Sequence, residues 1–206
     1  MWFYVIFGMM SDVDAFERIV NSRRSVYPKD YLPGRIEDSL VMKFLELADR
    51  APTHKRTEPW RFTVFTGEGL KKLASFQAEC YKKVTNANGT FKEDRYQNLL
   101  VKPMESSHII AVGMKRDPLK SIPDWEELGA VFCAVENIYL AATAHGVGCY
   151  LSTGGITNFE EAKEFFGLGP EDRLCGFIHL GLTAIYESDL PVSKRKPLSE
   201  KMNWVS

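Results

Sequence analysis

The sequence predicts an α+β fold, rich in helix and arranged as one domain. Segments in which apolar residues recur at helical spacing are more numerous than the short strand-like runs between them. The composition, with 45% hydrophobic and 26% charged residues, is that of a globular chain. The 206 residues are enough to bury a substantial core, and no internal repeat or low-complexity segment interrupts the layout.

A first helix is predicted over residues 12–21 by apolar side chains at helical spacing, namely Val13, Phe16, Ile19 and Val20. The segment "NSRRS" follows directly, so Arg23, Arg24 and Ser25 lie at the helix end or in the next loop. "PKDYLPGR" is a loop by its Pro and Gly content.

A second helix is predicted by one apolar face, made of Ile36, Leu40, Phe44, Leu47 and Ala51. Pro52 ends it, which leaves "RAPTHKRTEPWRF", residues 50–62, as a basic loop that leads into the strand "RFTVFT". A third helix lies in "LKKLASFQAECYKKV", with Leu70, Leu73, Phe76 and Tyr81 on one side. The polar stretch 85–98 is expected to be mobile.

The second half begins with "SHIIAVGMK", which predicts a buried strand. "WEELGAVFCAVENIYLAATAHG" is a helix that is apolar nearly all round, typical of a core or subunit-interface element. "GCYLST" and "RLCGFIHLGLT" are strand candidates. Between them a short helix is expected, with Asn158 and Glu161 at capping-box spacing and Gly167 as the C-cap.

Both ends of the chain lack a core pattern. Residues 1–11 are mostly apolar, but the run is too short to span a bilayer and has no signal-peptide features. They are interpreted either as an arm that packs on a partner subunit or as leader sequence before a start near Met10. Residues 12–206 form the single domain, which ends in the basic tail "PVSKRKPLSEKMNW".

The charge and the cysteines limit the possible partners. The formal net charge is −1, so no global field attracts nucleic acid or an anionic membrane, and any anion site must be local. Cys80, Cys133, Cys149 and Cys175 are far apart and form no C-x-x-C pair, which argues against a zinc or redox site. A reducing cytoplasm is the simplest compartment for such thiols.

The common catalytic signatures are absent: no P-loop, H-E-x-x-H, EF-hand loop or G-x-S-x-G occurs. "GEGLKK" lacks the third glycine of a dinucleotide fingerprint, so it predicts a plain helix start. "GVGCYLSTGG" follows a helix; it is either a C-cap and turn or a close backbone approach to a flat ligand. His108 and His179 are expected in the core, and His145 at a helix C-terminus.

His54 differs from the other histidines because it lies in the basic loop, near Arg50, Lys55 and Arg56. A single cluster of this kind is usually a solvated face. Two further basic groups, 23–25 and 194–196, occur in a chain of almost zero net charge. Together they suggest convergence on one polyanionic ligand, with Ser25 and backbone N–H groups adding phosphate contacts.

These motifs resemble those of the FMN-dependent nitroreductase family, in particular its short bacterial members. "SRRS" at 22–25 and "RAPTHKRTEPWRF" at 50–62 match two family motifs, "AHGVGCYLSTGG" matches the flavin loop after the central helix, and "SKRKPLSEKMNW" matches the tail. The resemblance runs from about residue 12 to 204. It implies a mostly antiparallel central sheet flanked by helices, a long buried central helix, and an intertwined homodimer with FMN at the subunit interface.

By position, the resemblance assigns FMN contacts to Arg23, Arg24, Ser25, Arg50, His54, Leu151, Ser152, Thr153 and Arg195. Matched short members have Trp and Arg where this chain has Leu151 and Ser152, so backbone contacts are expected there. Some short members lack the tail that carries Arg195. Residues 141–146 correspond to a nicotinamide-binding segment in relatives, although their apolar pattern equally suits packing.

The resemblance implies an NAD(P)H oxidoreductase. Hydride would pass from NADH or NADPH through FMN to a nitroaromatic or quinone-like acceptor in a ping-pong cycle. FMN supplies this chemistry, so no catalytic side chain or metal is expected. The alternatives are a non-catalytic flavin carrier or sensor, and a specialised dehydrogenase, dehalogenase or ene-reductase. A colourless protein that binds partners through its apolar arm is a further alternative.

Overall fold

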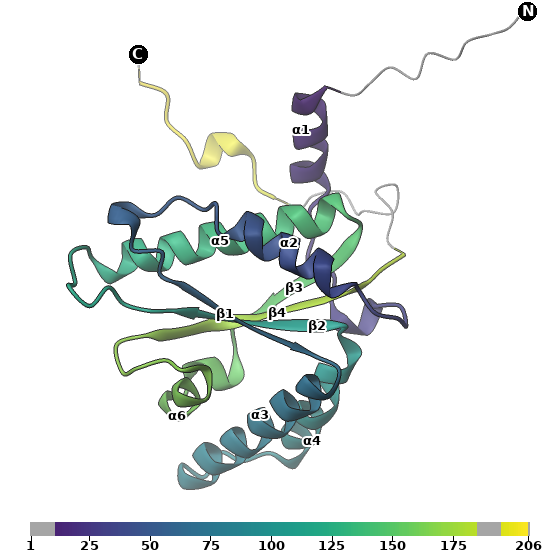
Figure 1. Ribbon diagram of the computed structural model, residues 1–206, viewed down its shortest axis with the longest axis vertical. Helices are drawn as coiled ribbons and strands as arrows, with labels where there is room; N and C mark the ends of the chain where they lie inside the picture. The colour runs from purple at the N-terminus through teal and green to yellow at the C-terminus, as the bar shows by residue number, and fades with distance from the viewer. Residues whose placement is uncertain (1–10, 185–194, 206) are drawn as a thin grey trace, which may run out of the picture.

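The protein is described by a computed structural model that covers residues 11–184 and 195–205. These residues contain one sheet, in the order β1 (Trp60–Thr66), β2 (His108–Met114), β4 (Arg173–Leu182) and β3 (Val147–Ser152). Every neighbouring pair is antiparallel. The α+β class and the antiparallel sheet are therefore confirmed, and β3 is left at one edge of the sheet (Figure 1).

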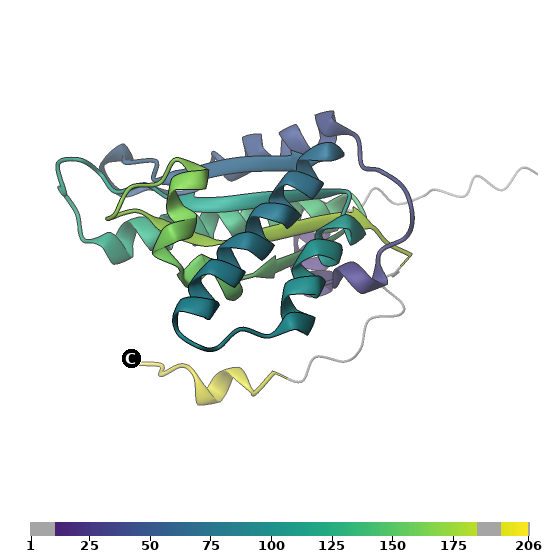
Figure 2. The ribbon, with the colours of Figure 1, turned by 90° about the horizontal axis from the view of Figure 1, so that it is seen from below.

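Helices cover both faces of the sheet. α2 (Asp38–Ala48) and α5 (Asp124–Ala144) lie on one face, and α3 (Glu68–Ala87), α4 (Glu93–Val101) and α6 (Glu160–Lys163) lie on the other (Figures 1 and 2). Successive strand side chains point to opposite faces. Ile110 accordingly joins the core under α2 and α5, whereas Ile109 joins the core under α3 and α6.

The long apolar helix α5 belongs partly to the core, as the sequence predicts. By length and composition it could cross a membrane, but half of its most apolar stretch is buried inside the fold, which is typical of a core helix. Val131, Ala134, Ile138 and Ala142 are fully enclosed. The outer side of α5 exposes Trp125 and Phe132 to 68% and 40%, so the helix also presents an apolar stripe to solvent.

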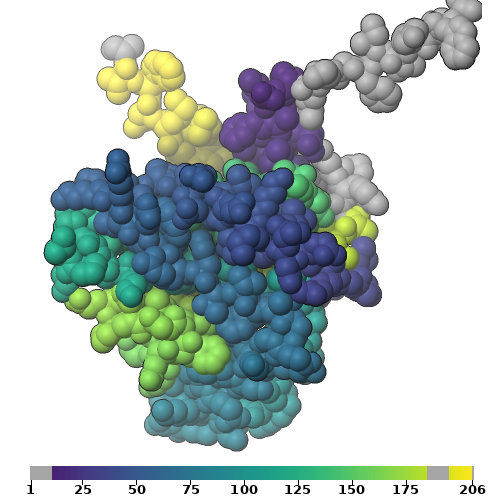
Figure 3. All heavy atoms as spheres, viewed as in Figure 1, coloured from purple at the N-terminus to yellow at the C-terminus, as the bar shows by residue number. Residues whose placement is uncertain are grey.

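α1 (Asp12–Ser22) projects from the body of the molecule (Figures 1 and 3). It begins at Ser11, whose hydroxyl accepts a hydrogen bond from the Asp14 N–H at 3.1 Å. No residue of α1 is buried, and Phe16 is 60% exposed. Packing within this chain therefore leaves the apolar face of α1 uncovered.

Three local predictions are wrong. Residues 85–98 are not an irregular mobile stretch, because α3 continues to Ala87 and α4 follows it, packed on α3. The capping box does not form, because α6 begins after Phe159 without a side-chain cap. α2 ends at Ala48, so its buried face contains Val41, Phe44 and Ala48, while Leu47 is exposed. Gly167 is the expected left-handed cap, at φ 68°.

Candidate FMN-binding site

Tyr139 of α5 joins two of the segments that the sequence singles out. Its side chain is buried, at 7% exposure. The Arg23 guanidinium carbon lies 5.3 Å from the centre of its ring, within the range of a cation–π contact. The phenol oxygen accepts the Leu151 N–H at 2.6 Å, and the Ser25 side chain lies close enough to influence the pKa of the phenol. Residues 23–25 and the end of β3 therefore meet at one phenol, a contact that no sequence motif reveals.

A backbone contact supports the same arrangement. The Val26 N–H donates to the Cys149 carbonyl oxygen at 3.0 Å, so the chain after α1 runs beside the edge strand β3. Burial raises the pKa of Tyr139, and the Ser25 hydroxyl partly opposes that rise. Burial also raises the pKa of the Cys149 thiol, which is therefore a neutral packing group and no nucleophile.

The two arginines after α1 have different surroundings. The Arg24 guanidinium donates to the carbonyl oxygens of Asn21 and Arg23 at 2.7 and 2.8 Å, so it satisfies free carbonyls at the helix end. The Arg23 Nε lies 3.7 Å from a Glu136 carboxylate oxygen, too far for a hydrogen bond. The Arg23 side chain is 20% exposed, so part of it is accessible to solvent.

The side chains at the end of β3 point inward. Leu151 packs against the core under α5. The Ser152 hydroxyl lies 3.3 Å from His179 Nε2, and the other ring nitrogen of His179 lies 3.0 Å from the Ser106 hydroxyl. Burial lowers the pKa of His179 to about 4, so this imidazole is neutral near pH 7. Thr153 follows the strand, and Gly154 has open space where a side chain would be.

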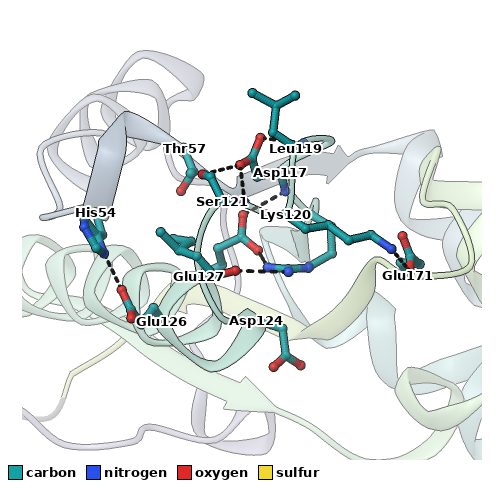
Figure 4. A network of polar contacts seen from close by, with 12 residues as sticks. His54, Thr57, Asp117, Leu119, Lys120, Ser121, Asp124, Glu126, Glu127 and Glu171 are labelled. Carbon is teal, nitrogen blue, oxygen red and sulfur yellow. Dashed lines mark hydrogen bonds and ion pairs between the residues drawn. The ribbon is translucent and has the colours of Figure 1, made fainter.

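The basic loop between α2 and β1 is strained and firmly held. Lys55, Arg56 and Glu58 adopt positive φ angles of 50°, 56° and 42°, which non-glycine residues rarely do. The His54 Nδ1 lies 2.5 Å from a Glu126 carboxylate oxygen, and the Lys55 ammonium donates to the Ser121 carbonyl at 2.8 Å. The first contact ties the short helix η2 (His54–Arg56) to the beginning of α5 (Figure 4), and the second ties it to the loop before α5.

A buried ion pair stabilises the segment that receives these contacts. Glu127 is fully buried and accepts hydrogen bonds from the Arg116 guanidinium and the Asp117 N–H. Arg116 also donates to the Ile122 carbonyl at 3.1 Å. Asp117 in turn accepts from the Ser121 hydroxyl at 2.5 Å, which lowers the pKa of its carboxyl group (Figure 4). The loop between β2 and α5 is thus a rigid base for His54.

Within one chain, the structure does not bring all the predicted residues together. Arg50 follows Leu47, whose carbonyl accepts the Asn137 side-chain N–H at 3.0 Å. Asn137 and Tyr139 are separated by about 200° around α5, so the end of α2, which precedes Arg50, and Arg23 lie on different sides of this helix. The His54 partner, Glu126, is about 20 Å along the axis from Tyr139.

Two other predictions have a plain structural description. Arg195 lies in the second described range, 195–205, whose side chains are exposed. In the segment 141–146, Ala141 and Ala142 are buried, and the Thr143 hydroxyl donates to the Tyr139 carbonyl at 2.8 Å. Packing therefore accounts for that part of the segment. Across 11–184 and 195–205, no cluster of three or more His, Cys, Asp or Glu side chains is arranged for a metal ion.

The donor set around Tyr139 fits a phosphate-bearing ligand. It combines guanidinium groups with an exposed hydroxyl, beside a strand end that leaves space at Gly154. The fold and this site define an α+β protein with a candidate anion-binding site at the edge strand of its sheet. The chain belongs to the nitroreductase family, whose model matches residues 20–182.

Two relatives share the name Putative NAD(P)H nitroreductase. YdjA of Escherichia coli (strain K12) is 30% identical over 170 residues, which cover 82% of this chain and 88% of YdjA. YfhC of Bacillus subtilis (strain 168) is 27% identical over 185 residues, covering 89% and 90%. The family assignment by motif is therefore confirmed over most of the chain.

Solved structures have the same fold. The nitroreductase-like family protein from Bacillus cereus aligns with a TM-score of 0.78 and 27% identity, covering 100% of this chain and 98% of that one. The FMN-dependent nitroreductase NfnB from Mycobacterium smegmatis, solved with NADPH, aligns with a TM-score of 0.72 at 16% identity, covering 95% and 100%. The second likeness shows a shared fold only.

Proposed function

We propose that this protein is an FMN-dependent NAD(P)H oxidoreductase. Hydride would pass from NADH or NADPH to an electron-poor acceptor, nitroaromatic or quinone-like, in a ping-pong cycle. The observation that carries the proposal is the meeting of Arg23, Ser25 and the Leu151 N–H at Tyr139, in a chain of the nitroreductase family. The names of the relatives, which include FMN and NAD(P)H, support the same cofactors.

The residues of this chain would bind and orient the cofactor. FMN, when bound, supplies the hydride chemistry, so the protein needs no nucleophile or acid–base pair of its own. Arg23 and Ser25 would hold the phosphate, and Arg24 would add positive charge; the contact of Arg23 with Tyr139 supports this assignment. Backbone groups of residues 152–153 and the turn at Gly154 would approach the flavin, because the side chains of Leu151 and Ser152 are engaged inward.

We also propose a homodimer in which both chains contribute to each FMN site. Several uncovered apolar residues lie on α1 and on the outer side of α5, with Phe16, Trp125 and Phe132 exposed to 60%, 68% and 40%. A second copy of the chain would cover them. It would also bring Arg50 and His54 of one chain toward Arg23 of the other. Phe132→Glu should therefore convert a dimer into monomers, as measured by light scattering.

The cytoplasm is the proposed compartment, since the four cysteines are free thiols in the structure. The experiment that tests the function compares the wild type with Arg23→Ala/Arg24→Ala. The wild type should purify with FMN and oxidise NADH or NADPH when a nitroaromatic or quinone is added. The double variant should lose both properties; full flavin occupancy in it would contradict the assignment. A wild type that binds FMN without turnover would instead indicate a flavin carrier or sensor.

A further inference from the structure

We infer that Tyr139 is a positioning residue for the FMN site, and that its hydroxyl assembles that site before the cofactor binds. This inference rests on the proposed function. It adds to that function a residue outside the basic motifs, on a helix that is distant in sequence from Ser25 and directly precedes β3.

The phenol oxygen is the only atom of Tyr139 that can link the two segments by hydrogen bonds. It accepts the Leu151 N–H at 2.6 Å, and it interacts with the Ser25 side chain, which opposes the rise in the pKa of the phenol. The ring alone supports Arg23 through the 5.3 Å contact. Removing the hydroxyl would therefore release Leu151 and Ser25 while leaving the support of Arg23 in place.

The geometry indicates preorganisation. Leu151 ends the stretch of β3 that packs on α5, and the next residues are those proposed to approach the flavin. A fixed Leu151 N–H keeps this strand end at one distance from Ser25. A site that is already ordered loses less conformational entropy on binding, so its affinity for the ligand is higher. Tyr139 itself would not contact FMN; it would act through Leu151 and Ser25.

Tyr31 offers a matched control. Its hydroxyl donates to the His179 carbonyl at 2.9 Å. Its ring packs against β3 at Gly148 and against the neighbouring strand β4 at Gly181. Tyr31→Phe therefore removes one phenol hydrogen bond in the same part of the fold. It leaves the contacts of Ser25 and Leu151 unchanged.

The test measures FMN affinity by titration of the FMN-free protein, together with amide hydrogen exchange in that FMN-free state. Tyr139→Phe should raise the Kd for FMN about tenfold and accelerate exchange of the Leu151 amide, because a buried N–H loses its acceptor. Tyr31→Phe should change the Kd by less than about twofold and leave Leu151 exchange as in the wild type. Equal Kd values for the wild type and Tyr139→Phe would overturn the inference.

A double-mutant cycle with Ser25→Ala, at an exposed residue, provides a second measurement. If Tyr139 positions Ser25, the serine substitution should weaken FMN binding much less in the Tyr139→Phe background than in the wild type. If the fold-changes in Kd of the two single variants multiply in the double variant, the two residues act independently and the inference is overturned. Failure of the wild type to bind FMN would instead overturn the proposed function itself.

Discussion

The separation of the two basic groups around α5 leads to a test by subunit complementation. Arg23 and Arg24 follow α1, whereas Arg50 and His54 lie on other parts of the α5 surface. The distance from Tyr139 to the Glu126 partner of His54, about 20 Å along α5, exceeds what one phosphate can bridge. In the proposed homodimer, the two groups that line one FMN would come from different chains.

The perturbation uses two variants, Arg23→Ala/Arg24→Ala and Arg50→Ala/His54→Ala, each expected to lose FMN by itself. In a heterodimer of the two, one site has all four substitutions and the other has none. Random mixing gives half heterodimers, so about a quarter of all sites should be intact, and about half in heterodimers purified through two different affinity tags.

The assay is the flavin absorbance retained after gel filtration, with NADPH oxidation as a second measurement. Two differently tagged copies of the same variant serve as the control and should retain no FMN. Heterodimers that also retain none would show that the two groups do not complement each other across the interface. That result would refute the reasoning from the α5 geometry.

Three further predictions concern stability. Glu127→Gln breaks the buried pair with Arg116 and should lower the free energy of unfolding by about 3–5 kcal/mol. Lys120→Ala removes the exposed pair with Glu171 and should lower the free energy of unfolding by at most about 1 kcal/mol. Urea titration measures both free energies. Gly181→Ala places a methyl group 2.1 Å from the Tyr31 ring and should lower the melting temperature, while Gly129→Ala, which meets open space in α5, should not. The neutral His179 contributes stability that is fully present above pH 6.5 and is lost as pH falls through about 4, because the unfolded state binds the proton more tightly. His179→Asn should therefore flatten the dependence of the unfolding free energy on pH in this range.

The elements that could be predicted from the sequence are those whose signal is local. The spacing of apolar residues in α5 and β2 reflects their own burial and is readable without a partner. α4 was missed because its stability depends on α3: Tyr96 and Leu99 pack against the core that α3 forms, and the Lys92 N–H donates to the Tyr81 hydroxyl at 3.1 Å. Contacts of this kind have no periodic signature.

The candidate site shows the same division. The basic segments at 23–25 and 50–56 could be found by composition, and the family resemblance assigns them to FMN. The residues that contact these segments could not be predicted, because Glu126 and Tyr139 have no distinguishing pattern within the apolar helix. Only the fold places them beside His54 and Ser25. The capping box at Asn158 failed for a related reason, since Phe159 and not Asn158 precedes α6.

α5 is apolar on nearly all sides because it packs on the core with one side and is proposed to form a subunit interface with another. One side is buried under α2 and on the sheet, and the side with Phe132 is exposed and proposed to meet a second chain. Between them, Glu126 and Tyr139 hold the two basic groups. A helix that must satisfy a core and an interface together has few positions left for charge. The positive charge is therefore carried by the loops that α5 supports, which explains why so basic a loop borders the core.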